Sequence, residues 1–190
     1  MEPNIRPSAE YLIGVKSIKI GSKTLMKLNT TLLSINKEGN GGTKISSATP
    51  YTLLESSIFK AVTQEFVKQL PNAKRVAAIK PFNFCFTSIS LSGTPSIDLV
   101  LQKENVYWRM AGANLMVQVN KNVMCLGILE RGHVDVQQKV ATSIIIGSHQ
   151  IEDNFLQFDL VQNKVGFSSL LLAQHTSCGS FQEYLSIDMR

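Results

Sequence analysis

The stretch of residues 144–167, IIIGSHQIEDNFLQFDLVQNKVGF, limits the possible folds of this chain more than any other. It begins with three isoleucines followed by Gly147, and a short apolar run that ends at a glycine is typical of a fully buried strand. Apolar and polar residues then alternate over residues 155–160 and 164–167, on either side of Val161-Gln162-Asn163. This alternation predicts a half-buried β-hairpin, so we expect the closing part of the chain to be β-structure.

The other periodic segments predict many short strands and one helix. Apolar residues recur at i, i+4 and i+8 from Ile58, which predicts an amphipathic helix near residues 55–70 with Ser56 or Ser57 as its N-cap. Strand-like runs occur at residues 11–20, 24–28, 32–35, 76–79, 82–86, 97–101, 106–110, 115–119 and 123–129, and the first two predict a hairpin. We therefore expect a mainly β fold with mostly antiparallel sheets and one clear helix.

Size and composition indicate one domain or one large lobe. The chain has 190 residues, of which 44% are hydrophobic and 17% are charged, so it is long enough to bury a single core. No window reaches ~18 uninterrupted apolar residues, and we expect no membrane-spanning segment. The first residues, MEPNIRP, lack the basic and apolar regions of a signal peptide, so we do not expect secretion on the chain's own instructions.

Charge is distributed unevenly along the chain. Residues 1–80 contain 12 Lys and Arg against 5 Asp and Glu, whereas residues 81–190 contain 7 against 9. A basic half favours an acidic partner or an acidic polysaccharide, and the alternative is a solvated surface without a partner. We do not expect nucleic acid as a partner, because the lysines stand singly between apolar residues, without an Arg cluster or a series of aromatic residues.

Most sequence signatures of enzymes are absent. The chain contains no P-loop, no dinucleotide-binding fingerprint, no H-E-x-x-H, no C-x-x-C and no G-x-S-x-G. Its three histidines, His133, His149 and His175, are isolated from one another in the sequence. We therefore expect neither a cofactor nor a metal site.

Three cysteines and one glycosylation sequence are the remaining sites of covalent chemistry. Cys85 and Cys125 each lie in a strand-like run, which suits a cross-link between two strands, and two buried reduced thiols are the alternative. The odd number of cysteines then leaves Cys178 without a partner in this chain. Asn29-Thr30-Thr31 is the only N-x-[ST] acceptor for N-glycosylation, usable only if the chain enters the secretory route.

The loop Asn40-Gly41-Gly42-Thr43, taken with the closing stretch, resembles part of a pepsin-like lobe. In such lobes an Asp-Ser/Thr-Gly-Thr/Ser loop precedes an apolar strand, and a second strand ending in Gly runs beside that loop. Asn40 stands at the position of the catalytic Asp, and Gly41, Gly42 and Thr43 follow it. Catalysis needs two carboxylates that share a proton, and a carboxamide cannot act as a general base near neutral pH. No Asp-Thr-Gly occurs in the chain, so proteolysis is not expected.

Further segments narrow the resemblance to one plant family. They are EYLIGVKSIKI, GGTKIS, PYTLLESSIFKAV, PSIDLVLQ and VYWR. They are similar to the C-terminal lobe of the group that comprises extracellular dermal glycoproteins, basic legume globulins, and proteinaceous inhibitors of xylanase and xyloglucan-specific endoglucanase. The resemblance implies an N-terminal extension at residues 1–10, a single pepsin-like lobe at residues 11–178, and a tail at residues 179–190.

The resemblance also implies a function and a set of site residues. It implies a non-proteolytic scaffold that blocks a microbial glycoside hydrolase in the plant cell wall, outside the cell. It implies a disulfide between Cys85 and Cys125, and a link from Cys178 to a separate N-terminal lobe. In the xyloglucanase-inhibitor branch an Arg three residues before the last Cys enters the acidic cleft of the target, and His175 takes that place here. Histidine gains charge below pH ~6.5, whereas a second Arg of that branch has no counterpart in residues 87–95.

Two other functions stay open at this point. The first alternative is an aspartic-type endopeptidase, or half of one, against which Asn40 weighs. The second is a truncated or storage-globulin-like product. A C-terminal lobe without its N-terminal lobe is expected to self-associate through Cys178 or through an exposed apolar interface.

Overall fold

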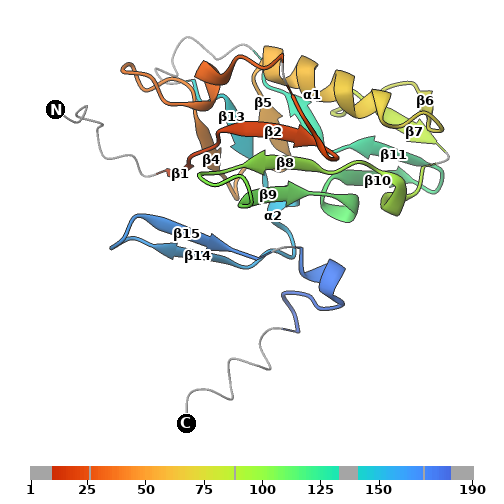
Figure 1. Ribbon diagram of the computed structural model, residues 1–190. Helices are drawn as coiled ribbons and strands as arrows, with labels where there is room; N and C mark the ends of the chain where they lie inside the picture. The colour runs from red at the N-terminus through yellow and green to blue at the C-terminus, as the bar shows by residue number, and fades with distance from the viewer. Residues whose placement is uncertain (1–9, 26, 88, 133–140, 169, 181–190) are drawn as a thin grey trace. The chain divides into compact units, whose positions relative to one another are not determined.

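The computed structural model describes residues 10–25, 27–87, 89–132, 141–168 and 170–180, and the chain forms two compact units (Figure 1). The first unit extends from Met1 to Gln150 and the second from Ile151 to Arg190. Most of the described secondary structure is β-strand, and antiparallel pairs outnumber parallel ones, which confirms the mainly β fold expected from the sequence. The lobe expected at residues 11–178 spans both units, and its boundaries stay a prediction.

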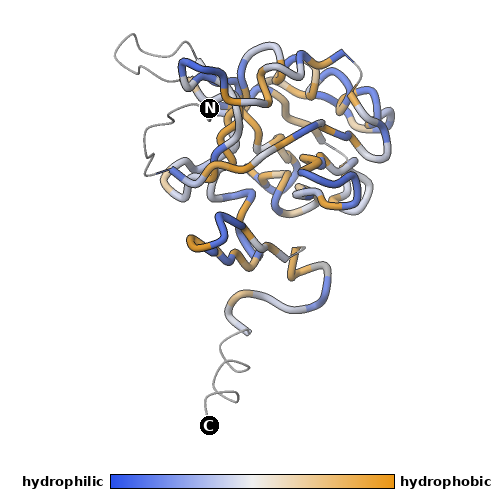
Figure 2. Tube along the Cα trace, turned by 60° about the vertical axis from the view of Figure 1, so that its left-hand side comes forward, coloured by the Kyte–Doolittle hydropathy of each residue, from blue (hydrophilic) through white to orange (hydrophobic). Residues whose placement is uncertain are grey.

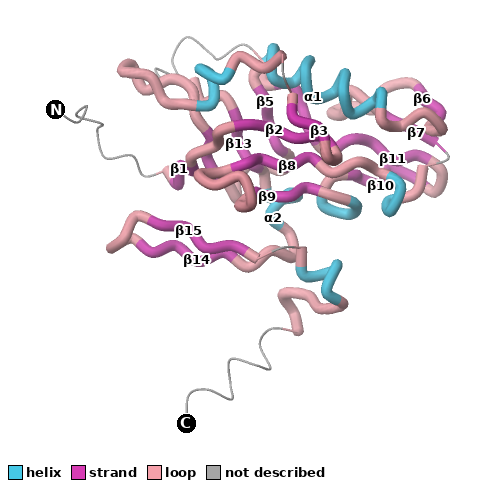
Figure 3. Tube along the Cα trace, viewed as in Figure 1, coloured by secondary structure: helices cyan, strands magenta, loops and turns pink. Residues whose placement is uncertain are grey.

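A five-stranded mixed sheet lies in the first unit (Figure 3). Its strands, in spatial order, are β1 (Tyr11–Ile13), β4 (Thr43–Ile45), β13 (Ile144–Ile146), β5 (Thr52–Leu54) and β12 (Ile128–Glu130). The central strand β13 runs parallel to β4 and antiparallel to β5. Ile144 and Ile146 are 0% exposed, so the prediction of a buried strand that ends at Gly147 is confirmed.

Two antiparallel four-stranded sheets complete the first unit. One has the order β3 (Lys23–Thr24), β2 (Ser17–Ile20), β8 (Ile97–Val100) and β9 (Tyr107–Met110). The other has the order β10 (Met116–Asn120), β11 (Val123–Leu126), β7 (Cys85–Thr87) and β6 (Lys74–Val76). Alternate residues of these strands supply much of the core, including Ile18, Leu99 and Trp108. This alternation is the pattern that the sequence showed, because successive side chains of a strand point to opposite faces.

The helix α1 (Ser56–Lys68) confirms the helix predicted near residues 55–70, and it packs against β2 and β12 (Figure 1). The prediction of Ser56 or Ser57 as the N-cap is wrong. The carboxylate of Glu55 accepts the backbone N–H groups of Ser57 and Ile58, at 2.9 and 3.2 Å. Ser56 already belongs to the helix, and only the residue before it can reach these two donors. No helix among the described residues is both long enough and apolar enough to cross a membrane.

The segment at residues 32–35 corrects another prediction, because it is not a strand. A 3₁₀-helix, η1 (Thr30–Leu33), forms here. The side-chain oxygen of Asn29 accepts the backbone N–H of Thr31 at 3.2 Å, and this cap starts a helical turn that strand propensity alone could not indicate. The other short helices are η2 (Leu91–Gly93), η3 (Gly112–Asn114), α2 (Ser148–Ile151) and η4 (Leu171–Gln174).

Several strand predictions are shifted or divided in the structure, and the strand expected at residues 82–86 is β7, at Cys85–Thr87. Residues 11–20 form two strands in different sheets, so the hairpin expected with residues 24–28 is reduced to β2 and β3. The strand expected at residues 76–79 ends at Val76. The run at residues 123–129 forms β11 and β12 on either side of Gly127, whose N–H donates to the carbonyl of Leu115 at 2.8 Å. Leu115 belongs to neither strand, so this hydrogen bond separates β11 from β12 at Gly127.

The second unit contains the predicted hairpin, formed by β14 (Leu156–Asp159) and β15 (Lys164–Phe167). Its turn is stabilised by Asp159, whose carboxylate accepts the N–H groups of Val161 and Gln162 at 3.0 and 2.9 Å. Asn163 has a φ of 53°, a left-handed conformation that asparagine tolerates better than most residues. Leu160 and Val161 are 73% and 94% exposed, and Figure 2 colours this turn as hydrophobic.

Candidate functional site

The loop at residues 36–42 is closed at its base by asparagine side chains and backbone bonds. Asn36 donates its N–H to the carbonyl of Asn40 at 2.8 Å, and its side-chain oxygen accepts the N–H of Asn40 at 2.8 Å. The same oxygen accepts the N–H of Glu38 at 3.1 Å. The loop thus turns the chain back toward β4 with most of its own polar groups satisfied.

A distant residue, Ala141, holds Asn40 and Gly41 in place. The carboxamide oxygen of Asn40 accepts the N–H of Ala141 at 2.8 Å, and the N–H of Gly41 donates to the carbonyl of Ala141 at 2.9 Å. Ile144, the first residue of β13, donates its N–H to the carbonyl of Gly42 at 3.1 Å. The strand that ends at Gly147 therefore runs beside this loop, as in the pepsin-like arrangement that the resemblance implied.

The last two glycines of the loop, Gly41 and Gly42, have conformations and surroundings that exclude other residues. Gly41 and Gly42 have φ values of 93° and 72°, in the left-handed region that strongly favours glycine. A Cβ atom on Gly41 would collide with the backbone carbonyl oxygen of Ser34, and one on Gly42 would lie 2.6 Å from Cγ1 of Ile35. The loop in this shape has no room at Gly41 for the Ser or Thr of the aspartic peptidase pattern.

The next two residues, Thr43 and Lys44, begin β4. Thr43 is 0% exposed, and its hydroxyl has no hydrogen-bond partner among the residues that the structure describes. Lys44 forms an ion pair with Glu10, with Nζ 2.5 Å from Oε1. The charge of Lys44 is thus directed to a carboxylate of the N-terminal segment.

The chemistry available to this loop is limited to hydrogen bonding. Asn40 is neutral over the physiological pH range, and its oxygen already accepts the Ala141 N–H. No group of three or more His, Cys, Asp or Glu side chains gathers into a possible metal site within the described ranges. The loop therefore presents a fixed backbone turn with a carboxamide at the position of the catalytic Asp, and its one carboxylate, Glu38, is exposed and lies two residues before that position.

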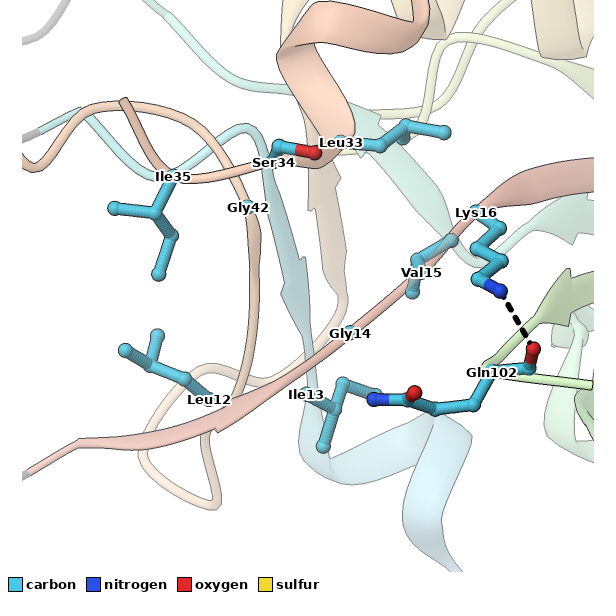
Figure 4. A pocket seen from close by; sticks show the side chains of 10 residues that line it. All are labelled: Leu12, Ile13, Gly14, Val15, Lys16, Leu33, Ser34, Ile35, Gly42 and Gln102. Carbon is cyan, nitrogen blue, oxygen red and sulfur yellow. Dashed lines mark hydrogen bonds between the residues drawn. The ribbon is translucent and has the colours of Figure 1, made fainter. Parts of the chain in front are cut away.

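A groove of about 380 Å³ lies beside the loop (Figure 4). Its wall includes Gly42, the segment at residues 33–35 and the segment at residues 12–16. Figure 4 shows Leu12 and Ile35 pointing toward each other across the space, while Lys16 donates to the backbone carbonyl of Gln102 at 2.7 Å. The groove is therefore mostly apolar, with polar groups at one end.

A buried glutamine, which sequence reasoning missed, joins the strands around β13. Gln150 is 0% exposed, and its side chain accepts the N–H of Thr52 at 2.7 Å and donates to the carbonyl of Gly127 at 2.9 Å. The hydroxyl of Thr52 accepts the N–H of Gly147 at 3.2 Å. A glutamine shortly after an apolar strand and a glycine was the available signal, but its two partners lie far away in the sequence.

The second unit holds His175 in an exposed position. His175 follows η4 with a φ of 57°, and its N–H donates to the carbonyl of Leu172 at 3.2 Å. Asp153 anchors the segment, because its carbonyl accepts the N–H of Leu171 at 2.8 Å and its carboxylate accepts the N–H of Cys178 at 3.2 Å. The imidazole thus stands on a fixed turn. His133 lies outside the described residues.

The cysteines are arranged as one disulfide and one thiol. Cys85 and Cys125 are 0% exposed and form a disulfide that joins β7 to β11, and Cys178 is free and exposed. The two bonded cysteines are direct partners in the antiparallel ladder, so the alternative of two reduced thiols is wrong. The pairing of Cys178 with a separate N-terminal lobe stays a prediction.

Asn29, the expected glycosylation acceptor, is exposed at the start of η1. Its side-chain oxygen accepts the N–H and the hydroxyl of Thr31, at 3.2 and 2.7 Å. The cap uses only this oxygen, so a sugar on the amide nitrogen would leave the cap in place. Glycosylation of Asn29 stays a prediction.

Comparison with known proteins identifies the family. The strand that ends at Gly147, the glycine loop beside it and the closing hairpin define a pepsin-like lobe. A family model described as "Xylanase inhibitor C-terminal" matches residues 10–169. The chain belongs to this xylanase inhibitor C-terminal family.

Two curated relatives illustrate the range of the family. The "Probable aspartic proteinase GIP2" of Nicotiana benthamiana is 54% identical over 181 residues, which cover 92% of this chain and 40% of the relative. The "Basic 7S globulin" of Glycine max is 38% identical over 167 residues, which cover 87% of this chain and 38% of the relative. The chain thus spans about two fifths of the length of these relatives.

Solved structures give the same result. The crystal structure of edgp superposes with a TM-score of 0.85 and 50% identity, covering 95% of this chain and 44% of that one. The crystal structure of basic 7S globulin from soybean has a TM-score of 0.71 and 37% identity, covering 89% of this chain and 41% of that one.

Proposed function

We propose that this chain is a non-proteolytic pepsin-like lobe that binds a microbial cell-wall glycoside hydrolase, a xyloglucan endoglucanase or a xylanase, and inhibits it in plant defence. The family to which the chain belongs supports the proposal by its description, and the loop at residues 36–42 supports it by its chemistry. The site of action is outside the cell, in the cell wall. A separate N-terminal lobe is a second proposed partner, because the chain spans only part of its relatives.

The observation that carries the proposal is the arrangement of Asn40 and Gly41. The carboxamide of Asn40 is already bonded to Ala141, and the carbonyl of Ser34 occupies the space in which a side chain at position 41 would lie. A peptidase would need a carboxylate at the first position and its shared-proton partner opposite. Retention of the lobe without this chemistry favours a role in binding.

His175 is the proposed contact residue. It is exposed, and hydrogen bonds from the backbone and Asp153 fix the turn that carries it. Glycoside hydrolases cleave with a pair of carboxylates, which attract a cation placed between them. A positively charged side chain at position 175 would therefore favour binding to the target.

The test is inhibition of a fungal xyloglucan-specific endoglucanase and of a xylanase by the purified chain at pH 5. His175→Ala should weaken inhibition about tenfold, and His175→Arg should restore or exceed it, because an arginine keeps the cation at every pH. Gln174→Ala, a change at the exposed neighbour, is the matched control and should leave inhibition unchanged. A folded chain that leaves both hydrolases fully active would contradict the proposal.

Aspartic-type endopeptidase activity is the second candidate, favoured by the name of the Nicotiana benthamiana relative. A pepstatin-sensitive peptidase assay at pH 3–6 on the chain and on Asn40→Asp separates the two functions. We expect no cleavage by either protein, because the substitution supplies one carboxylate and not its partner. Pepstatin-sensitive cleavage by the unmodified chain would establish peptidase activity. It would also show that Asn40 and Gly41 do not prevent catalysis.

A storage-globulin-like or truncated product is the third candidate, favoured by the likeness to basic 7S globulin. It predicts that the chain neither inhibits nor cleaves, and that it associates with itself. Light scattering with and without a reductant distinguishes association through Cys178 from association through an apolar surface.

A further inference from the structure

One face of the first unit is strongly basic. Residues 66–97 contain no Asp or Glu, yet they contain four Lys and Arg residues. This stretch begins in α1 and continues directly into the strand β6 (Figure 1). We call the exposed cations of α1, together with the cation of β6 that lies beside the helix, the basic face. Its members are Lys60, Lys68 and Arg75.

The helix contributes two cations. Lys60 and Lys68 are exposed and stand eight residues apart, on the side of α1 opposite to its buried residues. With a rise of 1.5 Å per residue, they lie about 12 Å apart along the helix axis. The charges are thus spread along the helix and do not converge on one point.

The strand contributes one more cation next to the helix. β6 is the edge strand of its sheet, and its Arg75 is exposed, whereas Lys74, the preceding residue, points to the opposite face of the sheet. The guanidinium of Arg75 lies over the ring of Phe84, 4.4 Å from the centroid, and this ring is 6.0 Å from that of Phe59 in α1. The stack of two rings places Arg75 beside the helix and limits its rotamers, so less entropy is lost when it binds an anion.

Acidic side chains do not cancel these charges. Glu65, on α1, accepts a hydrogen bond from Lys23 at 3.2 Å and lies 3.7 Å from Lys68. Glu55 is engaged in capping the first turn of the helix. Within the described ranges Lys60 and Arg75 form no ion pair, so the basic face keeps a net positive charge.

We propose that the basic face binds an acidic polysaccharide, a linear chain of uronic acid residues with free carboxylates. A linear polyanion can contact cations that are spread over a helix and an adjacent strand, and the fork of Arg75 matches a carboxylate. A nucleic acid fits less well, because base recognition needs exposed aromatic rings. Phe59 is buried, Phe84 is covered by Arg75, and the aromatic residues that are most exposed in the described chain, Tyr11 and Phe155, lie on other elements.

The test measures binding to de-esterified polygalacturonate by affinity electrophoresis at low salt and at ~0.3 M salt. Fully methyl-esterified pectin is the uncharged control ligand, and single-stranded DNA is the competing polyanion. The variant K60Q/K68Q/R75Q removes three charges of the basic face. The variant K103Q/K121Q/K164Q removes three exposed charges elsewhere, so the two proteins have the same net charge.

We expect the first variant to bind polygalacturonate roughly tenfold more weakly and the second to bind it almost as well as the unmodified chain. Binding should fall at high salt and be absent with the esterified polymer. Equal losses in the two variants, or equal binding of the esterified polymer, would overturn the proposal. Tighter binding of DNA than of polygalacturonate, lost in the first variant, would assign the face to nucleic acid instead. The inference is independent of the proposed function, since neither His175 nor the loop takes part.

Discussion

The loop at residues 36–42 and the hairpin at residues 156–167 both reverse the chain, but they are determined in different ways. The loop is held by residues that are distant in the sequence, above all Ala141, and by the carbonyl of Ser34 pressed against Gly41. The hairpin is held by its own ladder and by Asp159 in its turn. The comparison teaches that the candidate site depends on the whole first unit, whereas the hairpin is encoded locally.

This difference has consequences for stability. A change in the loop should be transmitted to η1 and β13, whose residues bond to it, and should lower the free energy of unfolding of the first unit. A change in the hairpin turn should be felt mainly in the hairpin, since a two-stranded ribbon is marginally stable by itself. Four substitutions examine this distinction, beginning with the largest expected effect.

Gly41→Ala should destabilise the first unit most, by about 3 kcal/mol, because it adds a Cβ atom against a backbone carbonyl at a left-handed φ. Urea unfolding followed by tryptophan fluorescence of Trp108 measures the effect. Gly93→Ala is the matched control, because a Cβ atom there meets nothing within 4 Å, and it should change stability by less than ~0.5 kcal/mol. Similar losses in the two variants would mean that the loop is not under the constraint described.

Asn40→Ala should destabilise by about 1–2 kcal/mol, because the N–H of Ala141 loses its acceptor. Asn40→Asp should cost much less at neutral pH, since a carboxylate accepts the same hydrogen bond. The urea midpoints of the two variants are compared with that of the unmodified chain. Asn40→Asp keeps both the size of the side chain and its hydrogen-bond acceptor, whereas Asn40→Ala loses both. If both variants lost the same stability, the bond to Ala141 would not be what fixes the loop.

Asp159→Ala should weaken the hairpin by about 1 kcal/mol, because two turn N–H groups lose their acceptor. The effect should be local: amide exchange in residues 164–167 should accelerate about fivefold, while exchange in β13 stays unchanged. Exchange followed by NMR measures both. Equal acceleration in β13 would show that the hairpin is not encoded locally.

Glu65→Gln should have the smallest effect and gives a baseline for an exposed charge pair. The hydrogen bond from Lys23 is the main cause that lowers the pKa of Glu65 below its ordinary value of 4.5. The pair therefore stabilises the folded chain above that pH and is lost as the pH falls through the lowered pKa. Melting temperatures of the two proteins should differ slightly at pH 7 and converge as the pH falls below the lowered pKa of Glu65. A difference that persists once the carboxylate is protonated would exclude the ionised carboxylate as its cause.

The same contrast explains how much the sequence could predict. The hairpin, the helix built on Ile58 and the strand at residues 144–146 follow periodic patterns, and the structure confirms them. The wrong predictions fall where a single polar side chain decides the outcome, as at Asn29, which starts η1, and at Glu55, which caps α1. Periodicity does not encode such choices, because each depends on one hydrogen bond.

The candidate site was predictable only in part, for the same physical reason. The sequence places Asn40 in a glycine-rich loop before a strand, and the resemblance assigns that loop a meaning. The bond from Ala141 and the crowding by Ser34 join residues that are far apart or unremarkable in the sequence. Only the folded chain reveals that the loop is shaped by its neighbours as well as by its own glycines.

The left-handed conformation of Gly41 constrains the order in which substitutions at positions 40 and 41 could accumulate during evolution. Asparagine becomes aspartate by one nucleotide substitution, so the charge at position 40 is easily regained. A hydroxyl residue at position 41 is a different matter, since its Cβ atom and the carbonyl of Ser34 cannot occupy the same space, and the segment after η1 must move first. Intermediates that carry only one of these changes are destabilised or gain nothing. Natural selection therefore has few paths back to an Asp-Thr-Gly loop, and a chain with this backbone is expected to keep a carboxamide there over long evolutionary times.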